Sequence, residues 1–194
     1  MLCFYPQKTV CTAPTAAQLF DALFAELKSQ LLRLPPALKD LFEVFSERIV
    51  LKSDPSGSFI SARTARKEQP EALQGIHSEH VLLICDEASN VSDLIFQAAG
   101  GSLSSTHSKL LMCGNPTRSE GYFYDAFTKL KDRWWLKTVS CEDSPRVSAE
   151  YIEEMAERYG RDSNTFAIRV LGNFAETSDD TIISNGLVES AVER

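Results

Sequence analysis

Three short segments that predict strands, each followed by polar residues or a proline, constrain the fold more than any other feature. They occupy residues 8–12 ("KTVCT"), 81–85 ("VLLIC") and 109–113 ("KLLMC"). Runs that are apolar on both alternating faces predict strands buried between two layers. The segments between them carry helical spacing, as in the apolar positions from Leu19 to Leu31. The sequence therefore favours an α/β fold with a mostly parallel sheet.

Further elements follow from local patterns. Residues 48–52 and 58–62 predict a hairpin, because the turn "SDPSG" between them holds Asp, Pro and Gly. Residues 134–140 ("WWLKTVS") predict another strand, and residues 63–80 a polar loop with a short helix. Helices are expected at 16–33, around Leu38, Leu41 and Phe42, at 91–99, from 121 onward, at 148–160 and at 163–174.

Composition excludes several classes of protein. The chain has 194 residues and a net charge of −7, which argues against a dedicated nucleic-acid coat but not against a local basic patch. No apolar run approaches the length of a membrane span, and no secretory signal is visible. Five widely spaced cysteines without a CxxC favour reduced thiols in the cytoplasm. The three histidines show no ligand spacing, so no metal site is expected from them.

The acidic pair Asp86–Glu87 follows the strand at 81–85 directly. In a parallel sheet, ligands bind beyond the carboxyl ends of the strands. An aspartate there can hold Mg²⁺, directly or through water, and a following glutamate can polarise a water for attack on a γ-phosphate. The alternative is a strand that ends in solvated acids.

Two other polar segments lie near predicted strand ends. Gly114, Asn115, Pro116 and Thr117 follow the strand at 109–113, and the Asn115 amide could donate to a phosphate oxygen and accept from a water. All four residues also favour a plain turn. The basic cluster that contains Arg63 and Arg66 is either a solvated loop or a contact to phosphate or DNA.

Taken together, these segments resemble the large subunit of tailed-phage terminases, the ATP-driven motor that packages viral DNA. The segments "TVCTAPTAAQ", "SFISARTARKEQPEALQGIHSEHVLLICDEAS", "LLMCGNPTRSEGYFYDAF" and "RVLGNF" follow one another in the order and rough spacing of that family. The resemblance extends over residues 8–191. It implies a three-layer, P-loop-NTPase-like (ASCE-type) ATPase domain over 1–174, and a linker over 175–194 toward a nuclease domain.

The resemblance also implies roles for individual residues. Asp86 matches the Walker B aspartate, Glu87 the catalytic glutamate, and Gly114, Asn115, Pro116 and Thr117 the coupling motif. Arg63 or Arg66 would face phosphate or DNA. The implied cofactors are ATP and Mg²⁺, and the implied partners are double-stranded DNA, the terminase small subunit, the capsid portal and further copies of the chain. The implied location is the cytoplasm of a bacterial host.

One departure from the family pattern changes these expectations. The chain contains no GxxxxGK[ST] sequence, so the P-loop and its strand are expected to be missing, as is the nuclease domain. We expect the chain alone not to bind ATP at useful affinity, and to expose two apolar strand edges. The alternative to a terminase ATPase region is a non-catalytic prophage remnant or split-gene fragment that pairs with a P-loop-bearing partner. The third hypothesis is an unrelated α/β nucleotide enzyme or helicase.

Overall fold

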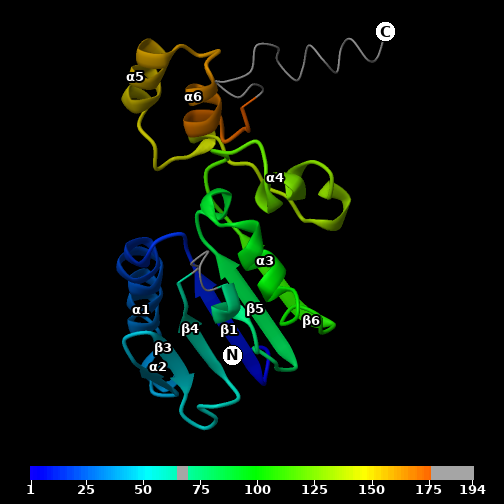
Figure 1. Ribbon diagram of the computed structural model, residues 1–194. Coiled ribbons are helices and arrows are strands. Elements are labelled where there is room, and N and C mark those ends of the chain that lie inside the picture. The colour runs from blue at the N-terminus through cyan, green and yellow to red at the C-terminus, as the bar shows by residue number, and fades with distance from the viewer. Residues whose placement is uncertain (65–69, 176–194) are drawn as a thin grey trace. The chain divides into compact units, whose positions relative to one another are not determined.

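The computed structural model of the chain describes residues 1–64 and 70–175 (Figure 1). The chain divides into two compact units, Met1–Gly114 and Asn115–Arg194. The first unit contains a six-stranded sheet with helices, and the described part of the second is helical. The expected boundary between an ATPase domain and a linker, at residues 174 and 175, remains a prediction.

The sheet of the first unit has the strand order β2-β3-β4-β1-β5-β6. Strands β1, β4, β5 and β6 run parallel, β3 is antiparallel to β4, and β2 is antiparallel to β3. This arrangement confirms both the mostly parallel sheet and the hairpin. The bounds are β1 Gln7–Thr12, β2 Phe42–Val44, β3 Arg48–Leu51, β4 Phe59–Ala62, β5 His80–Cys85 and β6 His107–Met112.

Helical segments cover both faces of this sheet, which gives the expected three layers. On one face, Cys11 of β1 packs in a buried cluster with Leu19 and Phe24. These two residues lie on a π-helical turn, Gln18–Phe24, that continues into α1 (Ala25–Leu32). On the other face, Val10 lines a small cavity with Leu73, Ala99 and their neighbours. The covering elements there are the 3₁₀ turn Pro70–Leu73 and helix α3 (Asp93–Ala99).

Two sequence predictions are wrong. The local pattern places Phe42 in a short helix, but α2 is confined to Pro36–Lys39 and Phe42 begins strand β2. Pairing of Phe42 with Leu51 buries its ring, and this tertiary contact overrides the local pattern. Residues 134–140, predicted as a strand, lie in none of the described strands. Trp135 there is 84% exposed, so its apolar character does not reflect burial between layers.

The edges of the sheet, within the described residues, are β2 and β6. The sequence predicts that a lost interior strand leaves two exposed apolar edges. Instead β4, β1, β5 and β6 are directly adjacent, so the parallel block has a single open edge, at β6. Leu111 on this strand is half exposed.

The second unit consists of short helices around a small core. They are α4 (Tyr122–Phe127), the 3₁₀ turns Lys131–Arg133 and Cys141–Asp143, α5 (Ala149–Tyr159), α6 (Asn164–Phe166) and a π-helical turn, Ala167–Leu171. Ser148 and Ser163 cap α5 and α6, since each hydroxyl accepts a hydrogen bond from a first-turn N–H. Met155, Phe166 and Val170 form one buried cluster, and α4 adds the buried residues Phe123 and Ala126.

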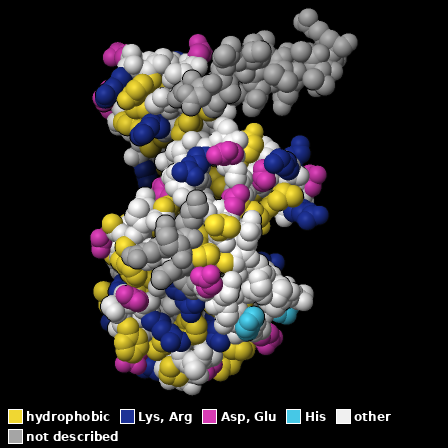
Figure 2. Space-filling model, in the orientation of Figure 1, with side chains coloured by type: hydrophobic (Ala, Val, Ile, Leu, Met, Phe, Trp, Pro, Cys, Tyr) yellow, Lys and Arg dark blue, Asp and Glu magenta, His cyan; other side chains and the backbone are white. Residues whose placement is uncertain are grey.

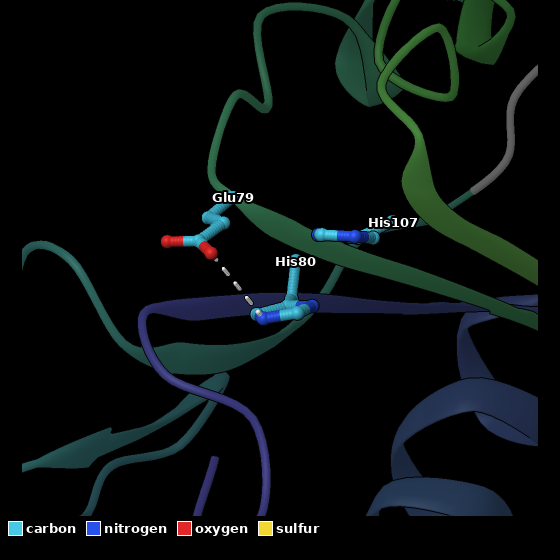
Figure 3. A group of neighbouring side chains, drawn as sticks. All are labelled: Glu79, His80 and His107. Carbon is cyan, nitrogen blue, oxygen red and sulfur yellow. Dashed lines mark ion pairs between the residues drawn. The ribbon is translucent and has the colours of Figure 1, made fainter.

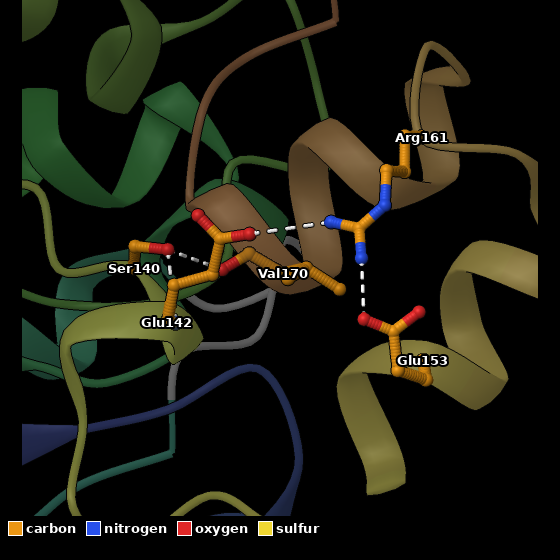
Figure 4. Close-up of polar contacts among 5 residues, drawn as sticks. All are labelled: Ser140, Glu142, Glu153, Arg161 and Val170. Carbon is orange, nitrogen blue, oxygen red and sulfur yellow. Dashed lines mark hydrogen bonds and ion pairs between the residues drawn. The ribbon is translucent and has the colours of Figure 1, made fainter. Parts of the chain in front are cut away.

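Polar contacts connect the helices of this unit (Figure 4). Arg161 reaches Glu142 on the second 3₁₀ turn at 3.6 Å and Glu153 on α5 at 2.6 Å. Ser140 donates a hydrogen bond to the carbonyl oxygen of Val170 at 3.2 Å. The ion pairs are half exposed and contribute little individually. Among the described helices, none is both long and apolar enough to cross a membrane.

Candidate functional site

The four parallel strands end in one row, and hydrogen bonds join neighbouring ends. The Thr12 hydroxyl, at the end of β1, donates to the carbonyl oxygen of Arg63 beyond β4 at 2.7 Å. The Asp86 N–H, beyond β5, donates to the carbonyl oxygen of Thr12 at 2.9 Å. The Cys113 N–H, beyond β6, donates to the carbonyl oxygen of Cys85 at 3.0 Å. The predicted polar strand ends therefore share one edge of the sheet.

Asp86 is fixed by two donors at this edge. Its Oδ1 accepts hydrogen bonds from the Glu87 N–H at 3.0 Å and from the Cys113 thiol at 3.3 Å. Burial, together with the charges of Asp86 and Glu87 and the hydrogen bond to Asp86, raises the pKa of the Cys113 thiol to about 12. The thiol is therefore protonated at neutral pH and acts as a donor to the carboxylate.

Glu87 has an unusual backbone conformation. Its φ of 48° and ψ of 43° are left-handed, and among the described residues it alone has a positive φ without being glycine. A left-handed residue with a Cβ costs about 1–2 kcal/mol, and such residues concentrate at functional sites. The next N–H, of Ala88, donates to the carbonyl oxygen of Cys113 at 2.9 Å and holds the turn against the end of β6.

Gly114 packs directly against this turn. A Cβ at Gly114 would lie 2.9 Å from the Cα of Glu87 and 3.0 Å from the nitrogen of Ala88, and its φ is +152°. Only glycine combines this conformation with this approach. The acidic pair and the glycine that opens the second polar segment are thus brought into contact.

The rest of that polar segment belongs to the second unit. The Thr117 N–H donates to the carbonyl oxygen of Asn115 at 2.8 Å, and Pro116 is buried while Asn115 is exposed. The boundary between the two units therefore falls inside the predicted coupling motif, directly after Gly114. The roles proposed for these residues remain predictions.

The basic segment is described only in part. Arg66 lies outside the described residues, whereas Arg63 follows β4 and is half-buried. Burial and the neighbouring charge of Arg48 lower the pKa of Arg63. A pocket of about 250 Å³ is lined by Glu47, Arg48, Phe59, Ser61, Ala62 and Arg63. Neither Arg48 nor Ser61 stands out in the sequence, because only the pairing of β3 with β4 places them side by side.

Two histidines meet at the opposite, amino-terminal ends of β5 and β6 (Figure 3). His80 and His107 are directly paired across the strands, and their rings stack at 4.8 Å with 16° between the planes. The ligand atoms of Glu79, His80 and His107 lie within 4.8 Å of one another. Sequence spacing could not reveal this pairing. One carboxylate oxygen and two imidazole nitrogens therefore lie close enough together to be candidate ligands of one metal ion.

Comparisons with known proteins identify the relatives of this chain. No model of a protein family matches it. The chain is 31% identical, over 98% of its length, to a probable terminase large subunit of Enterobacteria phage P7, of which it spans 41%.

Solved structures show the same fold. The large terminase of a thermophilic bacteriophage in complex with ADP superimposes with a TM-score of 0.69 at 16% identity, over 90% of this chain and 42% of that one. The large terminase ATPase domain of Thermus phage P74-26 gives a TM-score of 0.57 at 14% identity, over 87% and 77% of the two chains. The six-stranded, mostly parallel sheet is therefore that of terminase ATPase domains. The chain is a relative of part of the large subunit of phage terminases.

Proposed function

We propose that the chain supplies part of the ATP-hydrolysis site of a DNA-packaging ATPase. Asp86 and Glu87, at one edge of the sheet, are its acidic residues. The observation that carries this proposal is the contact of the strained Glu87 turn with Gly114 at the shared ends of β5 and β6. A strained residue held by tight packing is characteristic of functional sites. The relationship to terminase large subunits supports the same assignment.

Asp86 is suited to hold Mg²⁺, because its carboxylate is a hard oxygen donor and is only partly buried. When bound, the ion would spread the negative charge of the nucleotide phosphates. Two donors restrain Oδ1 of Asp86 and so fix the direction of the carboxylate. Glu87 would accept a proton from, or orient, the attacking water.

Gly114, Asn115, Pro116 and Thr117 would couple hydrolysis to movement. Gly114 touches the backbone of Glu87, and the peptide bond that follows it leads into the second unit. A shift of Glu87 during hydrolysis would therefore reach the second unit through one short segment. Arg63 would contact phosphate or DNA from the same edge of the sheet. Double-stranded DNA, the terminase small subunit, the capsid portal and further copies of the chain are the proposed partners.

We propose that ATP binding requires a phosphate-binding loop from a segment outside these 194 residues. Its sequence holds no GxxxxGK[ST], the element that cradles β- and γ-phosphates with backbone N–H groups and a lysine. Without such donors, Asp86 and Glu87 add negative charge near a polyanion. The isolated chain is expected to show no tight binding of ATP with Mg²⁺ in a calorimetric titration, and tight binding would contradict the proposal.

The catalytic assignment is testable by mixing the chain with a P-loop-bearing fragment and measuring ATP hydrolysis. Glu87→Gln should lower the hydrolysis rate by about 10²–10⁴-fold while leaving nucleotide affinity within a few fold, because the amide cannot take up a proton. Glu79→Gln is the matched control, since Glu79 is exposed at the other end of the same strand region. Equal activity of Glu87→Gln and the unmodified chain would refute the role of Glu87.

A further inference from the structure

One face of the β3–β4 hairpin gathers two arginines and a serine. Arg48 at the start of β3 is directly paired with Ser61 on β4. Arg63 follows two residues after Ser61, so it leaves the strand on the same side. All three residues line the pocket of about 250 Å³, and the Arg48 guanidinium lies over the Phe59 ring at 3.8 Å. The aromatic ring supports the arginine as one wall of this pocket.

Two buried polar atoms in this pocket lack hydrogen-bond partners. They are Nε of Arg48 and the hydroxyl oxygen of Ser61, and they are the two such side-chain atoms found among the described residues. Ser61 is 92% buried, since its exposed fraction is 8%. The other end of the Arg48 guanidinium is satisfied, because Nη2 donates to the carbonyl oxygen of Pro55 at 3.0 Å. Unpartnered buried donors are costly, so two of them in one pocket indicate a ligand that accepts hydrogen bonds.

The charge of the pocket points to an anion. Both arginines line one pocket, and burial, followed by the positive charge of Arg48, lowers the pKa of Arg63. Glu47 also lines the pocket but is exposed, so water screens its charge. Lys and Arg side chains are also gathered on the visible surface over β3 and β4 (Figure 2). An anion with several acceptor oxygens would offset the two positive charges and accept hydrogen bonds from Nε of Arg48 and the hydroxyl of Ser61.

We propose that Arg48, Ser61 and Arg63 form a binding site for a phosphate group. A phosphate offers the oxygens that a guanidinium and a hydroxyl can bind together. The Arg63 end of the site adjoins the edge of the sheet that holds Asp86, because the Thr12 hydroxyl hydrogen-bonds the Arg63 carbonyl and the Thr12 carbonyl accepts from Asp86. The proposal shares Arg63 with the proposed function and adds Arg48 and Ser61 as ligands. The phosphate belongs either to a nucleic-acid backbone or to a free phosphate compound.

Binding of inorganic phosphate to the full chain tests the site without any ATPase measurement. Titration calorimetry at low ionic strength is expected to show saturable binding at one site. Ser61→Ala and Arg48→Met should each weaken it about tenfold, which corresponds to one charge-assisted hydrogen bond. Arg33→Met is the matched control, because Arg33 is an exposed arginine of the same unit outside the pocket, and it should change affinity less than twofold. Glu47→Gln should change the affinity less than twofold, because water screens this exposed carboxylate.

A second readout separates loss of the site from loss of the fold. Ser61→Ala removes an unpartnered hydroxyl, so its melting temperature without phosphate should equal or exceed that of the unmodified chain, while the rise caused by phosphate should shrink. Competition with a short DNA duplex identifies where the bound phosphate group comes from. If DNA displaces inorganic phosphate, the site binds the phosphates of a nucleic-acid backbone. If DNA does not displace it, the site binds a free phosphate compound.

Absence of saturable binding, or equal binding by Ser61→Ala and Arg48→Met, would overturn the site. Neither result would affect the assignment of Glu87, which rests on hydrolysis. Equally, failure of the hydrolysis experiment would leave the phosphate site intact.

Discussion

At the scale of single residues, the site depends on the backbone of two residues that pack against each other, Glu87 and Gly114. Glu87 adopts a left-handed conformation despite its side chain, and Gly114 avoids a side chain at the one place where it would strike Glu87. The surrounding hydrogen bonds, from Glu87 and Ala88, hold the strained turn in place. The precise placement of the carboxylates is therefore tied to a glycine on another strand end.

Gly114→Ala should destabilise the chain by about 1–3 kcal/mol, because the new Cβ would lie 2.9 Å from the Glu87 Cα at a φ that side chains avoid. Urea denaturation monitored by circular dichroism measures the loss. Gly101→Ala is the control: a Cβ there meets nothing within 4 Å, and the change should stay within about 0.5 kcal/mol. Equal effects of the two substitutions would show that the close approach does not constrain the fold.

At the scale of elements, strand β6 leaves one edge of the parallel strands open among the described residues. Strands of parallel sheets are normally covered on both faces and paired on both sides. Here β6 pairs only with β5 among the described residues, and Leu111 is half exposed. An unpaired strand edge with exposed apolar side chains is a template for association.

Leu111→Lys should reduce self-association of the chain, because a charge on an edge strand opposes strand addition. Sedimentation velocity over a range of concentrations measures the effect. Leu32→Lys places the same charge on an exposed leucine at the end of α1 and should leave association unchanged. A chain that is monomeric at every concentration before substitution would contradict the expectation.

Local sequence patterns predict some elements and miss others for identifiable reasons. Strand β5 is predictable because residues 81–85 are all apolar, and β1 because it leads directly to Pro14 and a helix with regular apolar spacing. Strand β2 is not, because only its pairing with β3 makes Phe42 a strand residue. The same reason hides Arg48 and Ser61, whose proximity is set by strand register. The acidic pair at 86–87 can be found because it directly follows a recognisable strand, whereas the contact of Glu87 with Gly114 joins two strand ends that lie far apart in sequence.

At the scale of the whole molecule, the chain consists of two units with unequal cores. The sheet of the first unit is covered on both faces, whereas the core residues found in the described part of the second are Phe123, Ala126, Met155, Phe166 and Val170. A small core buries little apolar area and stabilises a unit weakly. The second unit should therefore unfold before the first.

Both tryptophans, Trp134 and Trp135, lie in the second unit, so fluorescence reports on that unit. Trp134 packs edge-on against Tyr122 with 6.1 Å between ring centroids. In urea, the fluorescence transition should come at a lower concentration than the circular dichroism transition of the sheet. Val170→Ala should lower only the fluorescence midpoint, because it removes buried atoms from the second unit alone. Coincident transitions would instead indicate one cooperative domain.

The boundary between the two units lies directly after Gly114, and this position links two features of the backbone. Gly114 is the last residue of the first unit and Asn115 the first residue of the second, so the boundary falls at the glycine that packs against Glu87. A change in the φ or ψ angle of Gly114 would alter the direction in which the chain continues and also the packing of this glycine beside Glu87. The torsion angles of Gly114 and the placement of the acidic turn are therefore set together.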